Sequence, residues 1–473
     1  MITLRPDQQA FIADLRAAFK RHRSVLGMAA TGFGKTYSAA AIVHGAINKG
    51  SRIIFAVHRD ELMHQTSKAF DAFGIPYGFI ASGVAYDRQP LVHIASIMTL
   101  AKRLDTVLPP NLVVIDEAHL SRAKTWHDVV QHYLTAGARI LGLSGSPQRL
   151  DGKGLGELFS TLVCGPSTAE LIAAGHLCRY RYFRGAEPDL TAFGRVAGEY
   201  TQAALDSAND SRLVGNIADR WIELASGRRT ICFTVSHEHS RSIIEEFAAR
   251  GVRAASISSK TRKAGERERI IREFADGEIR VLCNVELITT GFDLAAQVGR
   301  DVTVDCILMA RPTQSLALYL QMVGRGMRAK PYPCIILDHA GNSQRHGYPD
   351  DPRDWPLLYG GGKPAALPPP PLDCAKCLCQ VRQPPPGECP HCGEPWVSSD
   401  VSAARAIEYD EAARLVEVTE AQRLAEQVTK VEMRREEARC RTLEDWKEIE
   451  KNRGYKSGWA EHRFGARMNR GKR

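Results

Sequence analysis

The sequence predicts two consecutive parallel α/β domains, followed by a small cysteine-rich module and a helical C-terminal region. Three observations lead to this prediction. Short apolar runs of strand length alternate with segments of helical periodicity through the first 340 residues. Five of the 12 cysteines fall between residues 374 and 392. After residue 398 the sequence is rich in Ala, Glu, Arg and Leu, with apolar residues at helical spacing.

Length and composition exclude several classes of protein. The chain has 473 residues, is 44% hydrophobic and 25% charged, and so has the balance of a globular protein rather than a disordered one. No run approaches the roughly 18 consecutive apolar residues of a membrane span, and the first residues lack the apolar core of a secretory signal. We therefore expect a cytoplasmic protein with no membrane partner. The net charge of +9 first suggests a polyanionic partner such as nucleic acid.

The apolar runs form two groups, one for each predicted domain. The first group comprises residues 53–57, 91–95, 112–115 and 139–143, and the second comprises 230–235, 279–283, 304–308 and 334–337. Residues 177–214 between the groups are polar and irregular in pattern, which places a junction there. The predicted parts are domains at 1–176 and 177–345, a Gly/Pro-rich linker at 346–372, the cysteine module at 373–397 and the helical region at 398–473.

A glycine-containing loop lies between an apolar run and a strongly helical segment. Residues 29–36 have the sequence Ala-Ala-Thr-Gly-Phe-Gly-Lys-Thr. A strand, such a loop and a helix in this order surround phosphate oxygens with backbone N–H groups. Lys35 would meet the β and γ phosphates of ATP, and Thr36 would hold Mg²⁺. Thr31, Gly32 and Gly34 complete the expected ATP-binding loop, and the alternative is a turn that happens to precede Lys-Thr.

Two adjacent acids follow the apolar run at 112–115. A buried parallel strand that ends in Asp116 and Glu117 delivers two carboxylates to the crevice where such sheets bind ligands. Asp116 can hold the Mg²⁺ shell, while Glu117 can orient and deprotonate an attacking water. The alternative is an exposed first turn of a helix. Both segments in this order, about 80 residues apart, favour a joint site for phosphoryl transfer.

Residues 29–36 and the sequence Asp-Glu-Ala-His at 116–119 resemble motifs I and II of the superfamily 2 helicases, in a DEAH variant. Residues 4–8 resemble the upstream segment in which a Gln, here Gln8, contacts adenine, although Asp7 stands where an aromatic residue is common. Residues 56–62, 144–147, 281–294 and 321–328 resemble motifs Ia, III, V and VI. The resemblance covers roughly residues 1–340. It implies two RecA-like domains, ATP and Mg²⁺ as cofactors, and residues that couple ATP to nucleic acid: His119, Ser144, Ser146, Gly291, Asp293 and Gln321.

The segment that resembles motif VI also has a physical explanation. Phosphoryl transfer spreads negative charge over the γ-phosphate, and a guanidinium from outside the phosphate loop stabilises that charge. Arg325 and Arg328 are three residues apart, so we expect them to share one helix face. Because both belong to the second domain, the site would be complete only when the two domains close on ATP.

The cysteine module has the spacing of a zinc ribbon. Cys374-x-x-Cys377 and Cys389-x-x-Cys392 can place four thiolates around one Zn²⁺ ion. Cys379 is a spare cysteine that could replace Cys377. The ribbon could bind nucleic acid, dock a protein partner or staple a segment too small to fold alone.

Most of the net charge lies at the C-terminal end. Residues 451–473 contain eight Lys or Arg against one acid, which leaves a net charge of +7 there. Tyr455, Trp459 and Phe464 are interspersed with these cations, as is typical where phosphates are neutralised and bases stack. The alternative is a solvated basic end. Residues 456–464 resemble the end of some phage and bacterial helicase-like proteins.

The predicted function is an ATP-dependent helicase or translocase that acts on DNA rather than RNA. Residues 325–328 lack the Arg-Ala-Gly-Arg ending of the RNA-directed DEAH group and look more like the DNA repair and branch-migration members. The alternatives are the motor subunit of a nuclease or restriction complex, an RNA helicase, and an ATPase switch that separates no strands.

Overall fold

We analysed a computed structural model of the full chain. The residues that it describes are 3–58, 60–120, 124–147, 154–184, 195–196, 199–200, 211–258, 265–285, 294–353, 355, 372–373, 380–381, 416–418, 440, 442–453 and 460–461. The chain divides into two compact units, and residues 1–362 with 409–417 form the first, which contains both α/β domains.

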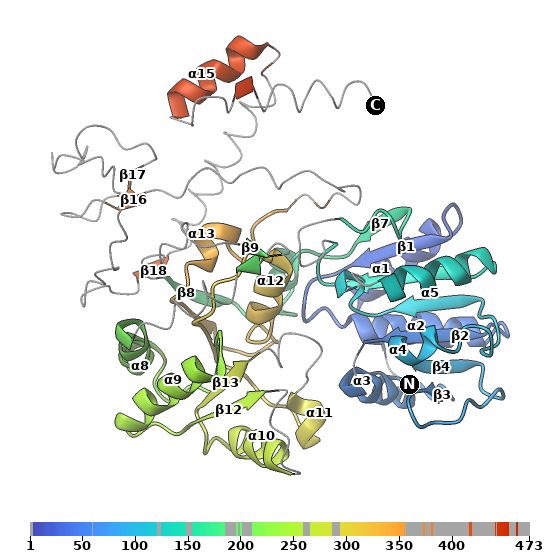
Figure 1. Ribbon diagram of the computed structural model, residues 1–473, viewed down its shortest axis with the longest axis horizontal. Helices are drawn as coiled ribbons and strands as arrows, with labels where there is room; N and C mark the ends of the chain where they lie inside the picture. The colour runs from blue at the N-terminus through green and yellow to red at the C-terminus, as the bar shows by residue number, and fades with distance from the viewer. Residues whose placement is uncertain are drawn as a thin grey trace. The chain divides into compact units, whose positions relative to one another are not determined.

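The first domain is built on a seven-stranded sheet (Figure 1, blue to teal). Its strands are β1 (Ser24–Met28), β2 (Ile53–Val57), β3 (Gly78–Ile80), β4 (Val92–Ser96), β5 (Leu112–Ile115), β6 (Arg139–Ser144) and β7 (Thr161–Cys164). The strand order is β3-β4-β2-β5-β6-β1-β7, and every pairing is parallel. β1, β2 and β5 are buried along their whole length, which explains their continuous apolar sequences.

The connections of this domain are mainly helices. They are α1 (Pro6–Ala18), α2 (Lys35–Ile47), α3 (Asp60–Ala72), α4 (Ile97–Ala101), a 3₁₀ turn (Ala118–Leu120), α5 (Lys124–Thr135) and α6 (Thr168–Ala173). Val113, Ile140 and Phe159 belong to one buried core that includes Trp126 and Tyr133 of α5. Burial of this sheet against helices fixes the carboxyl ends of β1, β2, β5 and β6 at one edge, where the predicted site residues follow the strands.

The second domain repeats this architecture (Figure 1, green to orange). Its sheet contains β8 (Tyr180–Arg184), β11 (Thr230–Phe233), β12 (Ala254–Ser258), β13 (Val281–Val285), β14 (Cys306–Met309), β15 (Cys334–Asp338) and β18 (Val416–Val418). The order is β12-β13-β11-β14-β15-β8-β18. β9 (Arg195–Val196) and β10 (Glu199–Tyr200) pair separately as a short antiparallel ribbon.

Helices also connect the strands of the second sheet. They are α8 (Ser211–Ala225), α9 (His237–Ala249), α10 (Glu266–Asp276), α11 (Leu294–Val298), α12 (Leu316–Gly324) and α13 (Asn342–His346). Trp221 of α8 packs edge-on against Phe247 of α9 at a centroid distance of 5.4 Å, and both belong to the core beneath the sheet. The two parallel-sheet domains confirm the predicted fold class, a pair of RecA-like domains.

The structure corrects two details of the predicted organisation. Residues 177–214 are not irregular throughout, because they contain β8, which pairs with β15, and the start of α8. Arg181 and Arg184, which lie among buried aromatic residues, gave this strand its polar pattern. Within the predicted helical region, residues 416–418 form the strand β18 and not a helix.

The described part of the C-terminal region is small. α15 (Leu443–Arg453) is helical as predicted, and Trp446 and Ile449 form a local apolar cluster with Cys440 and Ala460. A two-stranded ribbon joins β16 (Leu372–Asp373) to β17 (Gln380–Val381). The four predicted zinc ligands lie outside the described residues. Within the residues that are described, no group of three or more metal-ligating side chains is found, and no helix is long and apolar enough to cross a membrane.

Candidate functional site

The phosphate loop has the predicted strand, loop and helix arrangement. β1 ends at Met28, and α2 begins at Lys35. Gly32 and Gly34 adopt φ values of 89° and 92°, a left-handed conformation that favours glycine. The Lys35 ammonium turns back into the loop and donates a hydrogen bond of 3.1 Å to the Ala29 carbonyl oxygen. The loop thus holds a cation beside the N-terminus of a helix, which is the chemistry that binds phosphate.

The upstream segment braces this loop from one side. The Gln8 side chain donates to the Phe33 carbonyl oxygen at 3.1 Å, and Arg5 donates to the same oxygen at 2.8 Å. Asp7 accepts two hydrogen bonds of 3.0 Å from Arg5, so the position that lacks an aromatic residue serves to orient the guanidinium. Gln8 is 6% exposed, and its oxygen accepts from the Arg5 backbone N–H at 3.1 Å. The role of Arg5 was not evident from the sequence.

Asp116 and Glu117 follow β5 as predicted, but in two different electrostatic environments. Asp116 is 5% exposed, and burial together with the negative charge of Glu117 raises the pKa of its carboxyl to about 7. Burial also acts on Glu117, yet its neighbours, His119 and Lys35 first, outweigh burial and lower its pKa. Glu117 has a φ of 50°, the one left-handed value outside glycine among the described residues. The different surroundings of the two carboxyl groups and the unusual backbone conformation of Glu117 therefore suit these adjacent acids to different roles.

His119 joins the acidic pair to the second domain. Its Nδ1 lies 2.9 Å from the Ser144 hydroxyl oxygen and 3.3 Å from Glu117 Oε2, while its Nε2 lies 2.8 Å from Gln321 Nε2. Burial lowers the pKa of His119, so its ring is neutral. The Ser144 hydroxyl donates to the Ser146 carbonyl, which leaves His119 Nδ1 as the donor and Nε2 as the acceptor from Gln321. Four predicted coupling residues, Ser146, Ser144, His119 and Gln321, therefore form one hydrogen-bonded chain, and the Glu117 carboxylate lies beside it.

Arg325 and Arg328, the two arginines predicted to contact the γ-phosphate, occupy different positions. Arg325 caps the C-terminus of α12, and its positive charge contributes to the lowered pKa of Glu117. Arg328 is exposed, lies beyond the helix and forms an isolated β-bridge with Leu177. The expectation that both arginines share one helix face is therefore wrong, because α12 ends at Gly324.

The domains also meet at the Thr31 side chain. A Cβ atom added to Gly324 would lie 2.5 Å from Thr31 Cγ2, and one added to Gly145 would lie 3.3 Å from Thr31 Oγ1. Gly324 therefore has to be glycine for Thr31 to fit, whereas a Cβ atom at Gly145 would make a tight contact with Thr31. Gly145 stands where Ala is more frequent in the resembling motif, and an added Cβ atom would approach both Thr31 and Lys35.

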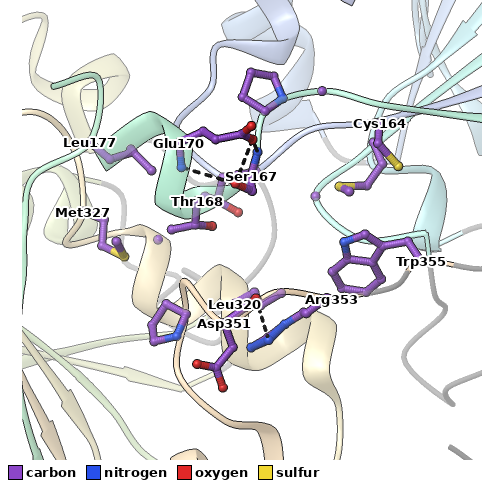
Figure 2. A pocket seen from close by; sticks show the side chains of 18 residues that line it. Cys164, Ser167, Thr168, Glu170, Leu177, Leu320, Met327, Asp351, Arg353 and Trp355 are labelled. Atoms are coloured by element: carbon purple, nitrogen blue, oxygen red, sulfur yellow. Dashed lines mark hydrogen bonds between the residues drawn. The ribbon is translucent and has the colours of Figure 1, made fainter. Parts of the chain in front are cut away.

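A cavity of about 660 Å³ lies next to this contact (Figure 2). Ala30, Thr31 and Gly145 line it from the first domain, Gly324 lines it from the second, and Arg353 and Trp355 of the segment after the second domain also line it. Its described lining does not include Lys35, Asp116 or Glu117. The cavity is therefore a neighbour of the phosphate-binding site and does not replace it.

The residues present fit a bound magnesium ion. Asp116 is a buried carboxylate whose charge burial disfavours, and a divalent cation offsets such a cost. Thr36 lies in the first turn of α2 beside Lys35, where a P-loop hydroxyl binds this ion. The predicted residues Gly291 and Asp293 lie outside the described part of the chain.

Two family models match the chain. Residues 1–149 match the model described as type III restriction enzyme, res subunit, and residues 213–330 match the helicase conserved C-terminal domain. A relative of 51.5 kDa from a Lactococcus phage (isolate 7-9) is 30% identical over 366 residues, which are 77% of this chain and 74% of the relative. The chain therefore belongs to the superfamily 2 helicases and carries their two ATP-dependent helicase-type domains.

Other relatives are longer than this chain. The protein named "Putative ATP-dependent helicase IRC3" from Saccharomyces cerevisiae is 30% identical over 267 residues, which cover 53% of this chain and 37% of that protein. The type I restriction enzyme EcoAI endonuclease subunit of Escherichia coli is 24% identical and covers 68% of this chain and 43% of the subunit. A solved fragment of a putative HsdR subunit from Vibrio vulnificus has a TM-score of 0.55 at 22% identity, covers 74% of this chain and 68% of that fragment, and shares the fold.

Proposed function

We propose that this protein hydrolyses ATP to translocate along nucleic acid, with DNA favoured over RNA, and that it remodels or unwinds forked or branched DNA. The observation that carries this proposal is the connection from Glu117, whose Oε2 lies 3.3 Å from His119 Nδ1, through the hydrogen bond between His119 and Gln321. It links the acid best placed to activate water to a helix of the other domain. A change of nucleotide state at Glu117 can therefore shift the balance between two arrangements of the domains.

Each side chain of the site has a separate task in this proposal. Lys35 neutralises the β and γ phosphates, and Thr36 with Asp116 would hold Mg²⁺, which neutralises charge on the phosphate oxygens. Glu117, kept ionised by its low pKa, orients the attacking water and accepts its proton. Arg325 stabilises the negative charge that develops on the transferred group. Arg328, which is exposed at a β-bridge, contacts phosphate only if this segment moves when ATP binds.

ATP turnover by the purified protein tests this proposal. We expect single-stranded or forked DNA to stimulate turnover more strongly than RNA does. Lys35→Ala is expected to abolish turnover because the phosphate loop loses its cation. Strong stimulation by RNA alone would contradict the preference for DNA, and near wild-type turnover by Lys35→Ala would contradict the site. A strand-displacement assay separates a helicase from an ATPase switch, which would hydrolyse ATP without releasing the strand.

A second candidate function is the motor subunit of a restriction or nuclease complex. The restriction-enzyme name of the family model at residues 1–149, and of the Escherichia coli relative, favours this candidate. Mg²⁺-dependent cleavage of DNA by the purified protein alone would show that the chain itself cuts. If ATP-dependent cleavage instead needs a second protein, the chain is a motor within a complex.

The C-terminal segments add two further parts to the proposal. The four cysteines of the predicted ribbon bind one Zn²⁺ ion and either contact nucleic acid or dock a protein partner. The basic residues of 451–473 bind the phosphate backbone. Deletion of these residues is expected to weaken DNA binding and to flatten its salt dependence.

A further inference from the structure

We propose that Lys330 is a positioning residue for ATP turnover, because its ammonium group fixes the turn after α12 and thereby holds Arg325 at the contact with the phosphate loop. Lys330 lies two residues beyond the segment that resembles motif VI, which ends at Arg328. The inference rests on the proposed function, since it concerns the arginine that stabilises charge on the transferred phosphoryl group.

The Lys330 ammonium joins two backbone segments of the second domain. Its Nζ donates a hydrogen bond of 2.5 Å to the carbonyl oxygen of Gly326, two residues after the end of α12. It donates another of 2.6 Å to the carbonyl oxygen of Val304, which precedes β14. A hydrogen bond from a charged donor is stronger than one between neutral groups, and a cation also suits the negative end of a helix dipole. The side chain therefore ties the turn after α12 to the start of β14.

The turn itself lies directly on the sheet. A Cβ atom added to Gly326 would be 2.5 Å from Cys334 Sγ and 2.7 Å from Ile307 Cγ1, so a side chain does not fit there. The Cys178 thiol makes a weak contact of 3.6 Å with the Gly326 carbonyl oxygen, and the Cys178 backbone N–H donates to the Met327 carbonyl oxygen at 3.0 Å. Gly326 has no side chain to hold its own position, so Lys330 supplies a charged anchor at its carbonyl group.

Arg325 lies where this turn meets the first domain. It follows Gly324, where an added Cβ atom would be 2.5 Å from Thr31 Cγ2 of the phosphate loop, and it precedes Gly326. Because glycine restricts the backbone less than other residues do, the backbone at Arg325 depends on neighbouring contacts to hold it. Lys330 makes such a contact one residue away. A misplacement of about 1 Å can cost about 100-fold in rate, so loss of this anchor should slow turnover.

A double-variant experiment with Arg325 separates positioning from simple stabilisation. Lys330→Met keeps the apolar stem and removes the charge and the N–H donors, whereas Lys330→Arg keeps both. Each is made in the wild type and in Arg325→Ala. Lys102→Met is the matched control, because Lys102 is exposed at the end of α4 in the first domain. We would measure kcat and KM for ATP at saturating DNA, together with the thermal unfolding midpoint. Lys330→Gln, which keeps an N–H donor without the charge, replaces Lys330→Met if that variant unfolds at the assay temperature.

We expect Lys330→Met to lower kcat by about 10-fold to 100-fold in the wild-type background, with KM unchanged. Lys330→Arg should recover part of this loss, and Lys102→Met should match the wild type. Arg325→Ala should lower kcat by at least about 100-fold. Adding Lys330→Met to Arg325→Ala should cost less than about threefold more, because the arginine that Lys330 positions is gone. Any fall in the unfolding midpoint should be the same in both backgrounds.

Equal fold-losses of kcat from Lys330→Met in both backgrounds would overturn the inference, because Lys330 would then act independently of Arg325. Unchanged kcat in Lys330→Met would overturn it as well. Wild-type kcat in Arg325→Ala would instead refute the role of Arg325 in the proposed function, on which the inference rests. A wild type without ATP turnover would refute that function altogether.

Discussion

The hydrogen bond between His119 and Gln321 is a contact between the domains whose energy can be measured. His119 Nε2 and Gln321 Nε2 are 2.8 Å apart, and the residues are 1% and 7% exposed. The other amide atom, Gln321 Oε1, is buried without a hydrogen-bond partner among the described residues. The contribution of the Gln321 side chain to this site therefore comes mainly from its hydrogen bond with His119. We would compare His119→Ala, Gln321→Ala and the double variant.

The expected magnitude follows from burial and from the neutral charge of the ring. A neutral intramolecular hydrogen bond contributes about 0.5–1.5 kcal/mol, whereas leaving one buried partner unsatisfied costs about 1–3 kcal/mol. Each single variant should therefore lower kcat by about 5-fold to 150-fold, at roughly 1.4 kcal/mol per tenfold. In the double variant both members of this hydrogen bond are removed, so neither is left unsatisfied by the loss of the other. We expect it to be about fivefold more active than the product of the single effects predicts, a coupling of about 1 kcal/mol.

These four proteins, the wild type, the two single variants and the double variant, form a double-mutant cycle. Steady-state ATP turnover at saturating DNA gives the kcat of each. The control cycle pairs Gln321→Ala with His132→Ala, because His132 is exposed on α5 and is not among the described hydrogen-bond partners of Gln321. In this control cycle, the fold-changes in kcat of the two single variants should multiply in the double variant. If the effects of His119→Ala and Gln321→Ala also multiply, the hydrogen bond does not couple the domains during turnover, and the reasoning from this geometry is refuted.

Three other features give testable expectations. Gly324→Ala would place a Cβ atom 2.5 Å from Thr31 Cγ2, so we expect about a tenfold loss of kcat, and Thr31→Gly should restore part of it. Burial lowers the pKa of His339 and His346 to about 3 and that of His239 to about 4. Because the unfolded chain binds these protons from about pH 6.5 downward, stability should fall as pH drops from 6.5 toward 4, by up to about 1.4 kcal/mol per pH unit for each histidine. Thermal unfolding at several pH values checks this, and a flat profile would contradict it. Zinc analysis of the purified protein should find about one ion per chain, and serine in place of the four ribbon cysteines should remove it.

Much of the fold could be predicted because its central strands are buried on both faces. β2 and β5 have the predicted bounds, since an apolar run without polar interruption has few alternatives in an α/β chain. β8 could not be predicted in this way. Arg181 and Arg184 interrupt its aromatic side chains, and the local sequence does not show that β15 lies beside it.

The sequence predicts those site residues that directly follow a strand along the chain. Lys35, Thr36, Asp116 and Glu117 follow strands directly, so the sequence order places them at one edge of the sheet. The role of Arg5 depends on which segments become neighbours, and a single sequence does not contain that information. The end of α12 was misjudged for a related reason, because glycines on both sides of Arg325 end the helix before Arg328.

The most direct test of the central claim is ATP turnover with and without single-stranded DNA for the wild type and for Glu117→Gln. This substitution keeps the size of the side chain and removes the carboxylate that accepts the proton of the attacking water. The account predicts that DNA stimulates the wild type, and that Glu117→Gln binds ATP but turns it over at least about 100-fold more slowly. Turnover by Glu117→Gln close to that of the wild type, or no response of the wild type to any nucleic acid, would contradict the account.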